Sequence, residues 1–87
     1  MGRVEIGRVF NYYSKAGVAA ISITAGELSV GDTIMIEGAT SSVTMEVGSM
    51  QKEHARVPKA TAGQSIGIKV PARVRPGDRV YKIELTP

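Results

Sequence analysis

The sequence predicts an all-β protein, a small closed six-stranded antiparallel β-barrel formed by one domain over residues 1–87. A chain of 87 residues has room for only one hydrophobic core. Ten Gly and four Pro interrupt segments rich in Val, Ile and Thr, and no segment has the periodicity of a helix. Apolar and polar residues alternate in most segments, which is typical of antiparallel strands. Closure into a barrel is favoured because it removes exposed strand edges.

Five segments show this alternation, so every second residue of each is expected to face the core. In the second segment, Ile21 and Ile23 share a face with Ala19. In the last segment, the apolar residues that share one face are Tyr81, Ile83 and Leu85. The expected strands span residues 3–13, 17–25, 32–38, 42–51, 64–70 and 79–85.

The first expected strand changes phase, because Val4 and Ile6 are followed by Val9 or Phe10 as the next inward residue. Gly7 lies at the change of phase and is predicted to form a β-bulge, which bends a strand around a barrel. The longest unassigned stretch, residues 52–63, is predicted to be a crossing loop with at most one helical turn.

A short pattern occurs twice, in residues 28–34 and again in residues 74–80. Each copy has an apolar residue, two spacers, Gly-Asp, one spacer and a β-branched residue. Glycine adopts the positive φ of a type II turn without strain, so each copy predicts a tight turn that leads into a strand. Asp32 and Asp78 are expected to accept hydrogen bonds from nearby backbone amides rather than to act in catalysis.

The composition excludes several classes of protein. The chain has no Cys, which excludes disulfides, thiol nucleophiles and thiolate metal sites. No apolar run is long enough to span a membrane and no signal peptide is evident, so a cytoplasmic protein is expected. Residues 1–51 contain three Lys and Arg against five Asp and Glu, whereas residues 52–87 contain eight against three. This asymmetry favours an anionic partner for the second half of the chain.

The sequence gives little support for an enzyme. His54 is the only histidine, and no serine lies in a nucleophile-elbow motif. No cluster of His, Asp or Glu has the spacing of a metal site. We therefore expect no catalytic residue, no metal and no cofactor, and we expect His54 to lie in a loop or at the barrel rim.

Basic and aromatic residues are the best candidates for contacts with a partner. Lys69, Arg73, Arg75 and Arg79 are concentrated in one stretch, and guanidinium groups suit phosphate. Adjacent residues of a strand point in opposite directions, so one of two neighbouring tyrosines should be exposed and able to stack on a base. The alternatives are a charged rim that promotes solubility and a surface for an acidic protein. The additional candidates are Arg8, Lys15, Tyr12 and Tyr13.

The ordered set of motifs resembles the second domain of translational GTPases, the β-barrel of elongation factor Tu and initiation factor 2. The match covers nearly the whole chain. A phosphate-binding loop is absent, so the resemblance implies neither GTPase activity nor nucleotide binding. The motifs that carry this resemblance are Gly7-Arg8-Val9, Gly26 through Ile34, Val47-Gly48-Ser49-Met50-Gln51, Ala60-Thr61-Ala62-Gly63 followed by Ile66-Gly67-Ile68, and Gly77 through Val80.

The chain is also similar to a small C-terminal barrel of collagenase-like peptidases and of related tRNA- or rRNA-hydroxylation proteins. Residues 12–19, Ser49-Met50-Gln51 with His54, and residues 74–83 carry this likeness. Both resemblances imply a barrel that docks onto other molecules. The sequence therefore predicts a non-catalytic binding module for RNA, the ribosome or a translation-related protein. The alternative is a protein–protein adaptor for a separately encoded peptidase- or hydroxylation-like partner.

Overall fold

The computed structural model describes residues 2–53 and 55–84, and in this part of the chain every regular element is a β-strand. The all-β class is therefore confirmed, but the prediction of six strands is wrong because the described residues form ten. The strands are β1 (Gly2–Tyr13), β2 (Val18–Ile23), β3 (Glu27–Ser29), β4 (Thr33–Glu37), β5 (Ser42–Glu46), β6 (Met50–Lys52), β7 (Ala55–Val57), β8 (Lys59–Thr61), β9 (Ser65–Lys69) and β10 (Arg79–Glu84).

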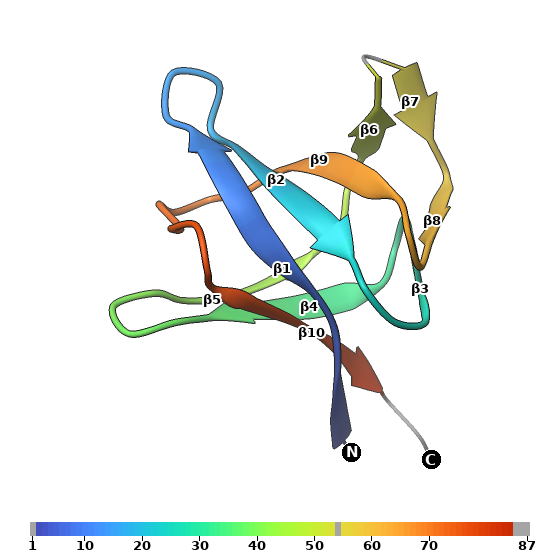
Figure 1. Cartoon of the computed structure of the whole chain (residues 1–87), viewed down its shortest axis with the longest axis horizontal. Helices are drawn as coiled ribbons and strands as arrows, with labels where there is room; N and C mark the ends of the chain where they lie inside the picture. The colour runs from blue at the N-terminus through green and yellow to red at the C-terminus, as the bar shows by residue number, and fades with distance from the viewer. Residues whose placement is uncertain (1, 54, 85–87) are drawn as a thin grey trace.

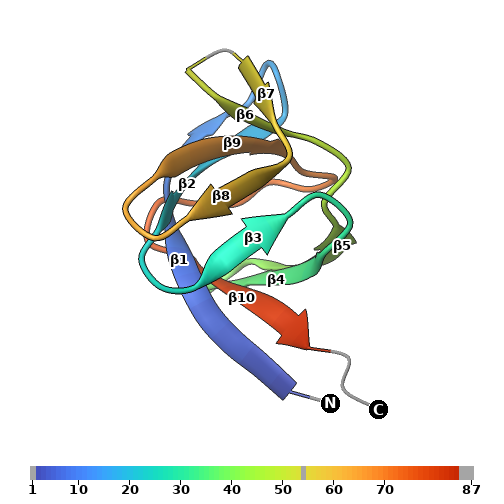
Figure 2. The same ribbon diagram turned by 90° about the vertical axis from the view of Figure 1, so that its right-hand side faces the viewer.

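The strands form two antiparallel sheets, one of eight strands in the order β5-β4-β10-β1-β2-β9-β6-β7 and one of two strands, β3-β8. Neither sheet closes on itself, so the prediction of a closed barrel is wrong. The eight-stranded sheet instead curves around the core, and the β3–β8 ribbon lies along one side of it (Figures 1 and 2). Leu28 of β3 and Ala60 of β8 are fully buried, so the ribbon completes the enclosure by packing rather than by a continuous hydrogen-bonded ring.

The additional strands explain both errors. The expected strand over residues 42–51 is interrupted after Glu46, which pairs with Thr33 at the start of β4, and the next residue, Val47, bonds to the turn at Gly31 and Asp32 that precedes β4. The chain resumes as β6, which pairs with only two residues of β9. Residues 52–63 contain β7 and β8 rather than a crossing loop. Strands of three residues are too short for alternation to reveal them.

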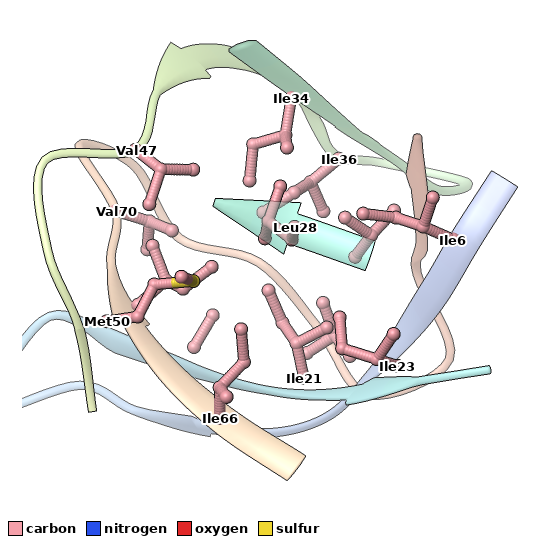
Figure 3. Close-up of a cluster of buried hydrophobic side chains, with 14 of the residues drawn as sticks. Ile6, Ile21, Ile23, Leu28, Ile34, Ile36, Val47, Met50, Ile66 and Val70 are labelled. Atoms are coloured by element: carbon pink, nitrogen blue, oxygen red, sulfur yellow. The ribbon is translucent and has the colours of Figure 1, made fainter. Parts of the chain in front are cut away.

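The core lies inside the curved sheet, where side chains from both sheets converge (Figure 3). Ala19, Ile21 and Ile23 are almost completely buried, as the alternation of β2 predicts. The expected face of the last strand is wrong, because Val80 is fully buried whereas Tyr81 and Ile83 are only half-buried. Leu85, which was expected on the same face, lies outside the described residues.

The predicted bulge at Gly7 is confirmed by a shift in the pairing of β1 with β10 between Glu5 and Gly7. A Cβ atom at Gly7 would collide with the backbone carbonyl of Ser22, so only glycine fits this close approach of β1 and β2. A second shift, in the pairing of β1 with β2, lies between Val9 and Asn11. Around it Val9 stays in the core and Phe10 is left half-exposed on the outside.

Both copies of the Gly-Asp pattern form the predicted turns. The Asp32 carboxylate accepts a hydrogen bond of 2.8 Å from the Ser29 amide, and the Asp78 carboxylate accepts one of 2.9 Å from the Arg75 amide. Gly31 and Gly77 share the same positive φ of 98°. β4 and β10 begin directly after these turns, so the predicted structural role of both aspartates is confirmed.

Each turn is also bound to a valine elsewhere in the chain by a pair of backbone hydrogen bonds. The Gly31 amide donates to the carbonyl of Val47, whose own amide donates to the carbonyl of Asp32, each at 2.8 Å. In the second copy, the Gly77 amide donates to Val9 at 2.8 Å and the Val9 amide donates to Asp78 at 2.9 Å. The two turns therefore fix the C-terminal end of β5 and the middle of β1 in the same manner.

We predict that Asp78→Ala destabilises the protein by about 1–3 kcal/mol, because it leaves the Arg75 amide without its acceptor beside a buried segment. Asp78→Asn retains an oxygen acceptor and should recover part of the loss. Urea unfolding followed by circular dichroism measures both. Equal stability of the wild type and the alanine variant would contradict the assigned role.

Gly7→Ala is expected to cost about 1–3 kcal/mol of stability, because the backbone of β2 must move to admit the methyl group. Gly48→Ala is the matched control, since a Cβ atom there meets nothing within 4 Å. Thermal unfolding of the two variants should show a lower Tm for Gly7→Ala alone. A similar Tm for both would mean that the close approach at Gly7 is not required.

Candidate functional site

The loop between β9 and β10 presents two of the predicted arginines to solvent. Val74 in the middle of this loop is almost completely buried and anchors it to the core. Neighbouring side chains of an extended segment point in opposite directions, so a buried Val74 directs Arg73 and Arg75 outward. Both arginines are exposed, and the Asp78 carboxylate holds the backbone amide of Arg75.

The two arginines share an open hollow of about 360 Å³ with Asn11 and Tyr12 of β1 and with Pro76. Tyr12 is half-buried and packs against the core, so its ring is held in place. Within residues 2–53 and 55–84, neither Arg73 nor Arg75 has a carboxylate within ion-pairing distance. Their guanidinium groups are therefore available to an external anion. We call this set of Tyr12, Arg73 and Arg75 the arginine–tyrosine surface.

Arg8 and Arg79 form a separate pair, because they are register partners on β1 and β10. The Glu5 carboxylate lies 4.0 Å from Arg8 Nε and 3.9 Å from Arg79 Nη1. Such exposed ion pairs add little stability, but they offset part of the positive charge that the sequence places here.

The three remaining candidates lie elsewhere. Lys69, at the end of β9, borders a different hollow, formed with the end of β5 and the start of the following loop. Lys15 is exposed in the turn between β1 and β2. Tyr13 is 52% exposed and Tyr12 is half-buried against the core, so the prediction that one of these tyrosines is exposed is confirmed. The eight candidates therefore do not all line one hollow.

A further hollow, of about 440 Å³, was not predicted from the sequence. Phe10 and Tyr13 lie on one side of it, and Ala20 of β2 and Gly67 of β9 line its floor. The signal that could have revealed it is Gly67, a glycine in the middle of an apolar strand, which often marks a place where another group approaches closely.

The described residues contain no assembled metal site. No group of three His, Cys, Asp or Glu side chains within them converges as a metal site requires. Every buried side-chain nitrogen or oxygen in this part of the chain has a hydrogen-bond partner. His54 lies outside the described residues. The part of the chain that the structure covers also contains no helix able to cross a membrane.

Comparison with known proteins agrees with the resemblance seen in the motifs. The family model described as elongation factor Tu domain 2 matches residues 16–81. A collagenase of Porphyromonas gingivalis is 40% identical over 94% of this chain, and an uncharacterized protease of Methanocaldococcus jannaschii is 45% identical over 97% of it. The chain spans only 20% and 21%, respectively, of the length of these two relatives.

A solved structure shares the fold. The crystal structure of the C-terminal domain of a Geobacillus thermoleovorans protein, described as a U32 peptidase, superposes with a TM-score of 0.84. The two chains are 19% identical, and the match covers 92% of each. The all-β fold, the paired Gly-Asp turns and the family match agree, and the chain belongs to the elongation factor Tu domain 2 family, in a form close to the C-terminal domain of collagenase-like peptidases.

Proposed function

We propose that this domain is a non-catalytic module that docks onto RNA, free or within the ribosome, through the arginine–tyrosine surface. The observation that carries the proposal is the placement of Arg73 and Arg75. Both are exposed, both lack an ion-pair partner among the described residues, and both lie beside the ring of Tyr12. The absence of catalysis is part of the same proposal.

The chemistry of the surface suits a nucleic acid better than a simple anion. A guanidinium group presents a planar fork of donors that matches two oxygens of a phosphate. The ring of Tyr12 and the side chain of Pro76 provide flat apolar faces beside it, on which an unpaired base can stack. The basic second half of the chain would steer RNA toward this side, with smaller contributions from Arg8, Lys15, Lys69 and Arg79.

We predict that the double variant Arg73→Glu/Arg75→Glu loses most of the RNA binding of the wild type. The measurement is co-sedimentation with ribosomes, and separately fluorescence anisotropy with a single-stranded RNA, across a series of salt concentrations. Wild-type binding should fall steeply with salt, and the slope of log K against log salt should decrease by about one for each phosphate contact that is lost.

Arg56→Glu is the matched control, because Arg56 is exposed on β7, on another side of the molecule from the β9–β10 loop (Figure 1). Arg56→Glu replaces one positive charge by one negative charge, as each of the two substitutions in the double variant does, but it should preserve RNA binding. Circular dichroism must show that all variants keep the wild-type fold. Absence of RNA and ribosome binding by the folded wild type at low salt would refute the proposal, as would equal losses in the control.

A second function, that of a protein–protein adaptor, is favoured by a different observation. The hollow beside Phe10 and Tyr13 is mainly apolar and has these exposed aromatic residues beside it, which is typical of protein-binding surfaces. The chain also spans about a fifth of the length of two relatives, one named a collagenase and the other a protease. An adaptor would contact a peptidase- or hydroxylation-like partner. Affinity purification that returns only ribosomal components would count against it.

A further inference from the structure

The apolar hollow lies between two hairpins that project from the same end of the molecule, β1–β2 and β6–β7, with β9 crossing between them (Figure 1). Its floor is formed by β2 and β9, where the register partners Ala20 and Gly67 leave little side-chain bulk. A Cβ atom at Gly67 would lie 3.2 Å from Val18 Cγ1, so a larger residue there would begin to fill the floor. We call this feature the hairpin groove.

The two walls of the hairpin groove differ in chemistry. Phe10 and Tyr13 of β1 form one wall, and they are 50% and 52% exposed although both are large and aromatic. Gln51 of β6 and Glu53 of the following turn form the opposite wall. An apolar floor with one aromatic wall and one polar wall suits an occupant that is itself apolar on one face and polar on the other.

The pairing of the strands restricts the shape of this occupant. β2 is paired on both sides, with β1 and β9, and β9 is paired on both sides, with β2 and β6. The floor at Ala20 and Gly67 therefore offers no free backbone edge, and a strand added there could not satisfy its own amides and carbonyls. A helix satisfies its backbone internally. β1 and β6 are separated by three strand spacings, at most roughly 14 Å, and a helix with its side chains is about 10 Å wide.

The charges at the two ends of the groove indicate a direction for such a helix. Gln51 pairs with Gly67, so the antiparallel course of β6 brings Glu53 toward the Ser65 end of β9. Val18 pairs with Lys69 at the other end, next to the turn that contains Lys15. A helix carries partial positive charge at its N-terminus and partial negative charge at its C-terminus. The complementary orientation places the N-terminus at Glu53 and the C-terminus at the two lysines.

We infer that the hairpin groove binds an amphipathic α-helix of a protein partner, in this orientation and with the aromatic wall against the apolar face of the helix. The inference rests on the adaptor function proposed above and is independent of RNA binding. The aromatic side chains would supply most of the binding energy, because large aromatic anchors at the centre of an interface usually do.

The experiment uses a displayed library of amphipathic helical peptides of about 18 residues, which is five turns, with the apolar positions varied on one face. The best binder is labelled, and its Kd is measured by fluorescence anisotropy for the wild type and for variants. We expect Phe10→Ser and Tyr13→Ser each to weaken binding about tenfold or more. Val4→Ser is the matched control, because Val4 is 46% exposed but does not line the groove, and it should leave Kd unchanged.

The orientation is tested with a spin label at either end of the peptide and NMR of the labelled domain. A label at the N-terminus should broaden the resonances around Glu53, and a label at the C-terminus those around Lys15 and Lys69. A scrambled peptide of the same composition should not bind. Broadening in the reverse order would overturn the orientation, and the double variant Lys15→Glu/Glu53→Lys should then bind more tightly rather than more weakly.

Several results would overturn the inference. These are failure of every library peptide to bind, binding that is unchanged in Tyr13→Ser, and groove resonances that respond to single-stranded RNA instead of helices. Self-association that Tyr13→Ser abolishes would assign the groove to a second copy of the chain.

If a peptidase-like partner binds the wild type and Tyr13→Ser equally well, the adaptor function stands and the groove inference fails. If helices bind the groove but no such partner binds the domain, the adaptor function fails instead.

Discussion

The hydrogen bond that an aspartate carboxylate accepts from the amide three residues before it determines much of this fold. It occurs once at Asp32 and once at Asp78, and in each case the following residue begins a strand. The turn fixes the phase of that strand, so the second residue after the aspartate, Ile34 or Val80, is fully buried. The paired bonds to Val47 and Val9 then attach these strands to segments distant in sequence. A local interaction thereby sets long-range register, which alternation alone leaves open.

The second copy of this turn also carries part of the candidate RNA surface. Val74 and Leu28 occupy equivalent positions in the two copies and are both almost completely buried. In the first copy the spacers after the apolar residue are Ser29 and Val30, whereas in the second they are Arg75 and Pro76. The fold therefore uses one turn twice, and the two copies differ in spacer residues whose side chains the turn does not need. Since the turn uses only the backbone amide of Arg75, a change of its side chain is expected to leave the fold intact.

The features that could be predicted from the sequence are those set by neighbouring residues. The six longer strands, the bulge at Gly7 and both Gly-Asp turns follow from local patterns of apolar residues and glycine. The three-residue strands and the open sheet could not be predicted, because their positions depend on pairing between distant segments. The inward face of β10 could not be predicted correctly, because apolar residues lie on both faces of this strand. Only the turn before β10 decides which face points into the core. Tyr81 is left outside, where the guanidinium of Arg3 lies 4.6 Å from the centre of its ring.

Neither candidate surface could be predicted as a unit, because each combines β1 with segments late in the chain. β1 also explains why the two surfaces are distinct. The bulge around Phe10 changes the facing of this strand, so that Phe10 and Tyr13 border the hairpin groove while Tyr12 packs against the core and borders the β9–β10 loop. A nucleic acid bound at Arg73 and Arg75 and a helix bound in the groove would therefore contact different sides of one strand. Occupation of one surface would then not require the other to be vacant, so if both proposals hold, this domain would join an RNA to a protein partner.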